Sequence, residues 1–212
     1  MVAKHLCRLP SRRMNLLVLS LCAALSWGCG SDPELPLLAA SDRVLAFGDS
    51  LTYGTGAPRG QSYPDVLAGL IGREVVNAGV PGEVTTEGLQ RLGGVLEKVS
   101  PRLVVLCHGG NDMLRKKNLA AAESNLRSMI ETIRGTGAAV IMLGVPRPGV
   151  FLSTAKFYER IAEDMRVPIE ADIVPDLLGD RQYKSDTVHP NARGYAKLAA
   201  AIDKLLRERG AL

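Results

Sequence analysis

The strongest constraint on the fold of this chain is a regular alternation of short apolar runs with longer amphipathic segments. The spacing predicts helices at residues 63–71, 89–99, 126–133, 154–165 and 195–206, and short strands at residues 44–47, 75–77, 103–107, 139–143 and 168–171. Strands that alternate with helices form βαβ units, and their parallel sheet is covered on both faces. The sequence therefore predicts an α/β fold, a doubly wound three-layer α/β/α sandwich around a five-stranded parallel sheet.

Polar and glycine-rich segments follow the predicted strands. Because ligands bind beyond the carboxyl ends of the strands in such sheets, these segments are the candidates for a site. They read Gly-Asp-Ser-Leu at 48–51, Asn-Ala-Gly-Val-Pro-Gly at 77–82, His-Gly-Gly-Asn-Asp at 108–112 and, before the last helix, Ser-Asp-Thr-Val-His-Pro at 185–190. Each segment alone is equally consistent with an ordinary turn or a helix cap. Thr85 and Thr86 are further candidate caps, for the helix at 89–99.

The segments together favour nucleophilic chemistry at Ser50. A serine hydroxyl is a poor nucleophile without an adjacent base, and His108 and His189 are the two histidines after residue 28. Asp186 precedes His189 by three residues, a spacing that on a turn of helix places both side chains on one face. His108 has no acid at such a spacing and is expected to line the floor of the site or to pack. We therefore predict Ser50 as nucleophile, His189 as base and Asp186 as the acid that orients it.

Attack by Ser50 on a carbonyl would create an oxyanion, which needs preset hydrogen-bond donors. The backbone N–H groups of Ser50 and Gly79 are two candidates, and the side-chain amide of Asn111 is a third. They come from three different strand ends. The sequence therefore predicts an oxyanion hole made of Ser50, Gly79 and Asn111.

These motifs resemble those of the SGNH or GDSL hydrolases, in the same order and over residues 43–206. The matching pieces are Gly-Asp-Ser-Leu at 48–51, Gly79, Gly-Gly-Asn-Asp at 109–112 and Asp-x-x-His at 186–189. The resemblance implies the flavodoxin-like SGNH-hydrolase fold, the roles given above for Ser50, His189, Asp186, Gly79 and Asn111, and Asp49 and Asp112 as supports behind them. The chain is most similar to the bacterial thioesterase, lysophospholipase and arylesterase group, which implies a serine esterase for small-molecule carboxylic or thio esters, with no cofactor. The segment 147–153 departs from the family pattern and is expected to shape the substrate pocket.

The first 28 residues have the composition of an export signal. They contain a basic stretch, no acidic residue, and an apolar run at 16–27 that is short for a membrane span. Small residues then precede Cys29, as in a bacterial lipoprotein cleavage site. We predict a signal peptide at 1–28, lipidation of Cys29, a tether at 29–42 and a hydrolase domain at 43–212. The expected location is the cell envelope or periplasm, as a membrane-anchored lipoprotein; the alternative is an ordinary signal peptide cut near the same place.

Charge and cysteine usage exclude several other classes. The chain carries 26 Lys and Arg against 22 Asp and Glu, but four of the basic residues lie in the acid-free leader. The remainder is electrically balanced, which argues against a nucleic-acid partner. Cys107, in an apolar run, is expected to be a small buried hydrophobe, and no Cys or His spacing indicates a metal site. We expect a monomer.

Three interpretations of the function are compatible with the sequence. The leading one is an exported esterase, in which Met113, Leu114 and residues 150–152 either receive an acyl chain or belong to the core. A carbohydrate O-deacetylase would use the same machinery with a smaller acyl pocket. A non-catalytic module that binds a phosphate or nucleotide at its Gly-rich loops is the different class, and it gives the Asp186/His189 pair no role.

Overall fold

One parallel sheet organises the computed structural model, which describes residues 1–2, 33–149 and 152–212. Its strands follow the order β2-β1-β3-β4-β5. They are β1 (Val44–Gly48), β2 (Val75–Gly79), β3 (Leu103–Cys107), β4 (Ala139–Leu143) and β5 (Ile169–Glu170). This is the flavodoxin-like order, so the predicted fold class is confirmed.

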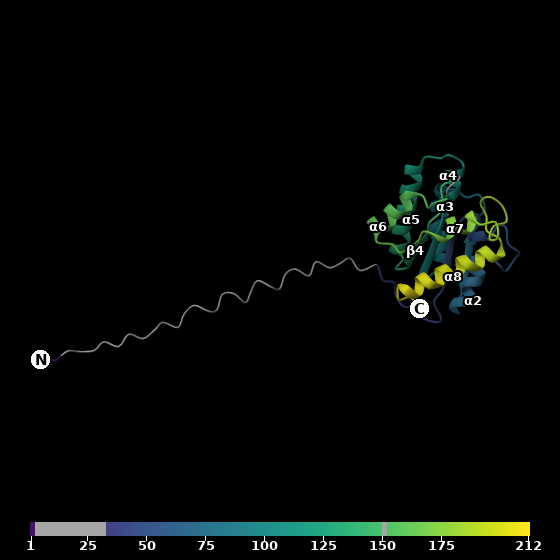
Figure 1. The fold of residues 1–212 in the computed structure, drawn as a ribbon. Helices are drawn as coiled ribbons and strands as arrows, with labels where there is room; N and C mark the ends of the chain where they lie inside the picture. The colour runs from purple at the N-terminus through teal and green to yellow at the C-terminus, as the bar shows by residue number, and fades with distance from the viewer. Residues whose placement is uncertain (3–32, 150–151) are drawn as a thin grey trace. The chain divides into compact units, whose positions relative to one another are not determined.

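Helices cover both faces of the sheet. On one face α2 packs against α8, with α7 beside α8; on the other, α5 packs against α3 and α6 (Figure 1). The helices are α1 (Ser50–Tyr53), α2 (Tyr63–Ile71), α3 (Thr85–Val99), α4 (Gly110–Leu114), α5 (Leu119–Gly135), α6 (Lys156–Met165), α7 (Ile173–Gly179) and α8 (Ala192–Glu208). The helix predicted at 63–71 has these bounds, whereas α1, α4 and α7 were not predicted because they are too short to show an apolar period.

The two central strands are apolar throughout because both of their faces are covered. Every residue of β1 and β3 is buried, and β1 pairs with both β2 and β3. In this register Gly48, at the end of β1, lies beside Gly79 on one side and Cys107 on the other. Three strands therefore end at the same level, and the segments that follow them converge on one edge of the sheet.

The predicted tether at 29–42 needs a correction in its described part. Leu35 and Leu38 are buried in the core, and their N–H groups donate to the carbonyl oxygens of Arg209 and Ala211 at 2.8 and 2.9 Å. The Arg73 guanidinium also donates to the carbonyl oxygen of Leu38 at 2.7 Å. Residues 35–39, here called the N-terminal strap, therefore belong to the folded domain, which begins before residue 43. Cys29 and residues 30–32 lie outside the described residues.

Candidate active site

Ser50 stands at the point where β1 ends and α1 begins. Asp49 is the N-cap of α1, and its Oδ1 accepts the N–H of Leu51 at 3.1 Å, so the chain turns sharply at the serine. The turn needs a glycine before it: a Cβ on Gly48 would lie 2.0 Å from the carbonyl oxygen of Cys107. Close packing of β1 on β3 thus explains why the strand ends on Gly-Asp-Ser.

His189 and Asp186 come from the loop that joins α7 to α8. The turn of helix predicted for this pair is not observed, because α8 begins only at Ala192. The loop is instead shaped by Asp186 itself, whose Oδ1 accepts the N–H groups of Val188 and His189 at 2.8 and 2.9 Å. This local turn brings the imidazole back over its own carboxylate.

Ser50, His189 and Asp186 form one chain of hydrogen bonds. His189 Nδ1 lies 2.8 Å from Asp186 Oδ2, and His189 Nε2 lies 3.0 Å from Ser50 Oγ. Burial favours the neutral acid at Asp186, but the hydrogen bonds from His189 and from two backbone N–H groups lower its pKa below the usual value. The ionised carboxylate accepts the proton of Nδ1, which leaves Nε2 free to accept the hydroxyl proton of Ser50.

Asn111 lies beside this chain, on α4. Its Nδ2 donates to Asp49 Oδ2 at 3.2 Å and to the carbonyl oxygen of Glu83 at 3.0 Å. Asp49 is buried, and this burial raises the pKa of its carboxyl above the usual value. Asp49 thus contacts two parts of the site with one carboxylate, the Asn111 amide and the first turn of α1, in agreement with the supporting position expected for it.

Asp112, the second expected support, lies on α4 and contacts α3. Its carboxylate accepts the N–H of Thr85 at 2.9 Å and the hydroxyl of Thr85 at 2.8 Å. Thr85 is a candidate cap in the sequence, but the N-cap of α3 is Val84. The free N–H of Thr85, in the first turn of α3, is accepted by Asp112 from another helix. Asp112 therefore fixes α4 against α3 and has no hydrogen bond to Ser50, His189 or Asn111 in the described part of the chain.

The structure does not bring Gly79 to the site in the manner predicted. Gly79 is absent from the wall of the pocket beside Ser50, and its N–H donates to Asn77 Oδ1 at 2.9 Å. A Cβ there would lie 2.1 Å from the backbone nitrogen of Tyr53, so the glycine permits close packing of β2 on α1. Gly82 lines the pocket instead, in the left-handed conformation with φ 81°. The Pro81-Gly82 pair, a common turn signal, could have pointed to it.

A largely apolar pocket of about 260 Å³ opens beside Ser50 and His189. Of the residues expected to receive an acyl chain, Leu114 and Leu152 line this pocket, whereas Met113 is packed in the core. Residues 150 and 151 lie outside the described residues. The segment 147–153 contributes Arg147, Pro148 and Leu152 to the wall. Within the described ranges, no three His, Cys, Asp or Glu side chains gather as a metal site would require.

The fold and the Ser50–His189–Asp186 chain define this protein as a serine hydrolase of the α/β/α sandwich class. The chain belongs to the GDSL-like lipase/acylhydrolase family, whose model matches residues 46–197. This assignment confirms the family resemblance seen in the sequence.

Characterised relatives include esterases. Esterase TesA of Pseudomonas aeruginosa is 36% identical over 131 residues, which are 59% of this chain and 65% of TesA. An arylesterase of Vibrio mimicus is 31% identical over 174 residues, covering 77% of this chain and 87% of the relative. Among solved structures, the esterase AlinE4 is 32% identical, covers 81% of this chain and 97% of its own, and has a TM-score of 0.61.

Proposed function

We propose that this protein hydrolyses small-molecule carboxylic or thio esters through an acyl-enzyme on Ser50. The observation that carries the proposal is the chain Ser50 Oγ–His189–Asp186, with links of 3.0 and 2.8 Å, at the mouth of an apolar pocket. This chain has a clear use in acyl transfer and none in a phosphate-binding module.

In the first half of the reaction, Ser50 Oγ attacks the ester carbonyl and passes its proton to His189 Nε2. The resulting imidazolium is stabilised by the ionised Asp186. The tetrahedral intermediate collapses, the ester bond breaks, and His189 returns the proton to the departing alcohol or thiol. In the second half, water attacks the acyl group while His189 takes a proton from it; the bond to Ser50 Oγ then breaks, His189 returns this proton to Oγ, and the carboxylic acid leaves.

Three donors can meet the oxyanion. Ser50 and Gly82 both line the pocket, and neither of their backbone N–H groups has a hydrogen-bond acceptor among the described residues. The Asn111 amide borders it as well, with both of its hydrogens already engaged; the longer of its bonds, 3.2 Å to Asp49, is the one we expect to be shared with the oxyanion. Gly82 thus replaces Gly79 in our proposal.

The pocket favours an acyl chain longer than acetyl and argues against a carbohydrate O-deacetylase. Four wall residues, Leu114, Val145, Leu152 and Leu178, offer no polar partner to a sugar, and they outnumber the polar side chains of Thr55, Arg147 and Thr187 that also line the pocket. At about 260 Å³ its volume is close to the lower end of small-molecule sites, which is about 300 Å³. We therefore propose short and medium acyl chains as the substrate class.

A panel of p-nitrophenyl esters from acetate to palmitate, with acyl-CoA and lysophospholipid beside it, tests this proposal. We expect the rate to peak above acetate and below palmitate. Ser50→Ala should abolish hydrolysis in a folded protein, while Ser100→Ala, an exposed serine on the opposite edge of the sheet, should not. A fluorophosphonate probe should label Ser50 once. Labelling elsewhere, or full activity in Ser50→Ala, would disprove the mechanism.

Export and lipidation of Cys29 are a separate proposal, which rests on the sequence of the leader. None of the helices in the described ranges is long and apolar enough to cross a bilayer. Mass spectrometry of the mature N-terminus tests the proposal. A lipid-modified Cys29 supports the anchor, and an unmodified N-terminus near residue 29 would instead support the ordinary signal peptide.

A further inference from the structure

A buried ionic cluster of Glu83, Arg91 and His108 lies beside the proposed oxyanion hole, and the proposed mechanism does not use it. The Glu83 carboxylate accepts Arg91 Nε at 2.6 Å, a terminal nitrogen of Arg91 at 2.7 Å and His108 Nε2 at 3.0 Å. The side chains of Glu83 and His108 are 5% and 0% exposed. Burying a carboxylate is costly unless the group is fully hydrogen-bonded. The three donors around Glu83 meet this requirement.

The protonation states in the cluster follow from its hydrogen bonds. The N–H of Gly109 donates to His108 Nδ1 at 3.0 Å, so Nδ1 carries no proton and Nε2–H donates to Glu83. Burial favours the neutral acid at Glu83, but the hydrogen bonds from His108 and Arg91 hold its pKa below the usual value. The cluster is therefore a carboxylate and a guanidinium with a neutral imidazole.

Arg91 connects this carboxylate to the ends of two strands. The terminal nitrogen that binds Glu83, Nη2, also lies within hydrogen-bond distance of the carbonyl oxygens of Gly48, at 3.2 Å, and Ala78, at 2.9 Å. Its guanidinium also lies over the Phe47 ring, 4.1 Å from the centroid. Gly48 is two residues before the nucleophile, so the position of Glu83 is fixed relative to Ser50.

The main chain of Glu83 holds two of the proposed oxyanion donors. Its carbonyl oxygen accepts the Asn111 amide at 3.0 Å. Its N–H donates to the carbonyl oxygen of Val80 at 3.2 Å and closes the turn in which Gly82 has its positive φ. One residue thus positions both the side-chain amide and the backbone N–H that face the substrate.

We propose that Glu83 is a positioning residue for the oxyanion hole. Its side chain, held by Arg91 and His108, fixes the turn at Gly82 and the carbonyl that orients Asn111. This inference rests on the proposed function. Glu83 touches no reacting atom, so its effect must pass through Asn111 and Gly82, and this requirement makes it testable.

The test is a double-mutant cycle on p-nitrophenyl butyrate hydrolysis. Glu83→Gln places an amide donor against the Arg91 guanidinium, and we expect kcat to fall about 10- to 100-fold with KM within about twofold, since one lost oxyanion donor costs about 100- to 1,000-fold. In an Asn111→Ala background the same substitution should cost at least about fivefold less, because coupled residues are non-additive. Equal costs in the two backgrounds would overturn the proposal.

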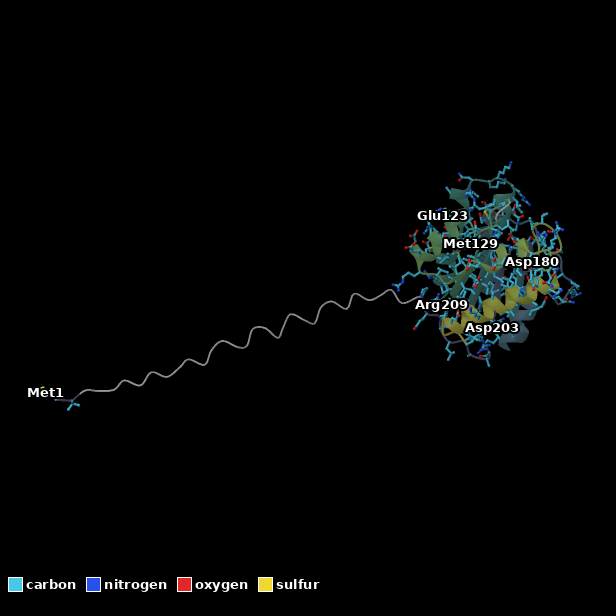
Figure 2. The ribbon with its side chains drawn as sticks, in the orientation of Figure 1. Met1, Glu123, Met129, Asp180, Asp203 and Arg209 are labelled. Carbon is cyan, nitrogen blue, oxygen red and sulfur yellow. The ribbon has the colours of Figure 1, made fainter. Side chains whose placement is uncertain are left out.

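The matched control is Glu123→Gln. Glu123, labelled in Figure 2, also binds two arginines, at 2.9 Å from Arg127 and 2.6 Å from Arg160, but on the outer face of α5. We expect its kcat to equal that of the wild type, and a loss like that of Glu83→Gln would overturn the proposal by showing a general effect of ion-pair removal.

If Glu83→Gln fails to fold, Arg91→Lys replaces it in the same double-mutant cycle. Lysine keeps the charge but loses the planar fork that reaches both carbonyl oxygens and the carboxylate. We expect about a tenfold loss of kcat that shrinks in the Asn111→Ala background; wild-type kcat in folded Arg91→Lys would overturn the proposal. Ser50→Ala is measured alongside. Activity that does not depend on Ser50 refutes the proposed function, whereas Ser50-dependent activity with additive losses refutes the role of Glu83 alone.

Discussion

Asp186→Asn should impair catalysis more than Asp186→Ala, although asparagine is the closer mimic in shape. Asp186 Oδ1 accepts two backbone N–H groups, from Val188 and His189, at 2.8 and 2.9 Å. In the asparagine variant the side-chain carbonyl oxygen must take the position of Oδ1. An amide nitrogen there would face the N–H groups of Val188 and His189, which need an acceptor. The amide nitrogen then takes the place of Oδ2, 2.8 Å from His189 Nδ1.

An amide donor at that position selects the wrong tautomer of His189. The proton moves to Nε2, 3.0 Å from Ser50 Oγ, where it prevents the imidazole from accepting the serine proton. In this variant the active tautomer lacks the charge-assisted hydrogen bond that the wild type has, which is worth about 1.5–3 kcal/mol. It also leaves a donor unsatisfied, at a cost of about 1–3 kcal/mol. The sum of about 2.5–6 kcal/mol corresponds to about 10²- to 10⁴-fold in kcat.

Exposure places the expected loss in the lower half of that range. The Asp186 side chain is 52% exposed, so water can partly replace the lost interactions. We therefore expect about a 10²- to 10³-fold loss for asparagine. Alanine removes the carboxylate but lets water accept the Nδ1 proton, so it loses only the charge-assisted bond, or about 10- to 100-fold.

Steady-state hydrolysis of p-nitrophenyl butyrate at saturating substrate, with circular dichroism to verify folding, measures both losses. Asp180→Asn is the control: Asp180, labelled in Figure 2, accepts one backbone N–H from Gln182 at 2.8 Å in the same loop but does not contact His189. It should keep wild-type kcat. A larger loss in Asp186→Ala than in Asp186→Asn would refute the tautomer argument.

Three further outcomes concern stability. Gly48→Ala should cost at least about 3 kcal/mol in urea unfolding, because its Cβ would lie 2.0 Å from the Cys107 carbonyl oxygen; a cost below about 1 kcal/mol would contradict this packing. Gly94→Ala, in the middle of α3 with no atom within 4 Å of the new Cβ, should stabilise by about 0.5–1 kcal/mol and raise Tm, and a lower Tm would count against the helix. The lowered pKa of Glu83 means that its ionised form stabilises the fold above the unfolded value of about 4.3, and this contribution is lost as the pH falls through the folded pKa. The advantage of the wild type over Glu83→Gln should therefore shrink in urea titrations below about pH 4, and an advantage that grows on acidification would show the sign to be wrong.

The fold was predictable because its signals are local and repeated. The apolar runs of β1, β3 and β4 contain few polar residues, since both faces of these strands are buried, and the helical stripes between them mark the crossovers. Parallel strands place all the following loops at one edge of the sheet. Ser50 and His189, although 139 residues apart, could therefore be assigned to one site from the order of the motifs alone.

The parts that could not be predicted depend on contacts between distant loops. The Pro81-Gly82 pair marks a turn in the sequence, but only the conformation of that turn shows that Gly82, and not Gly79, faces the pocket. The Glu83–Arg91–His108 cluster joins three segments with no spacing motif, so the sequence shows no partner for His108. The N-terminal strap has the sequence character of a tether, because Leu35 and Leu38 lie among prolines and polar residues without an apolar period.

The N-terminal strap joins the domain at the end away from the pocket. Helix α8 begins two residues after the proline that follows His189, and its 17 residues lead about 25 Å away from the pocket to the residues that bind the strap. Five residues lie between Cys29 and Leu35 in the sequence. The chain that leads to the proposed lipid site at Cys29 therefore leaves the domain at the end away from the pocket.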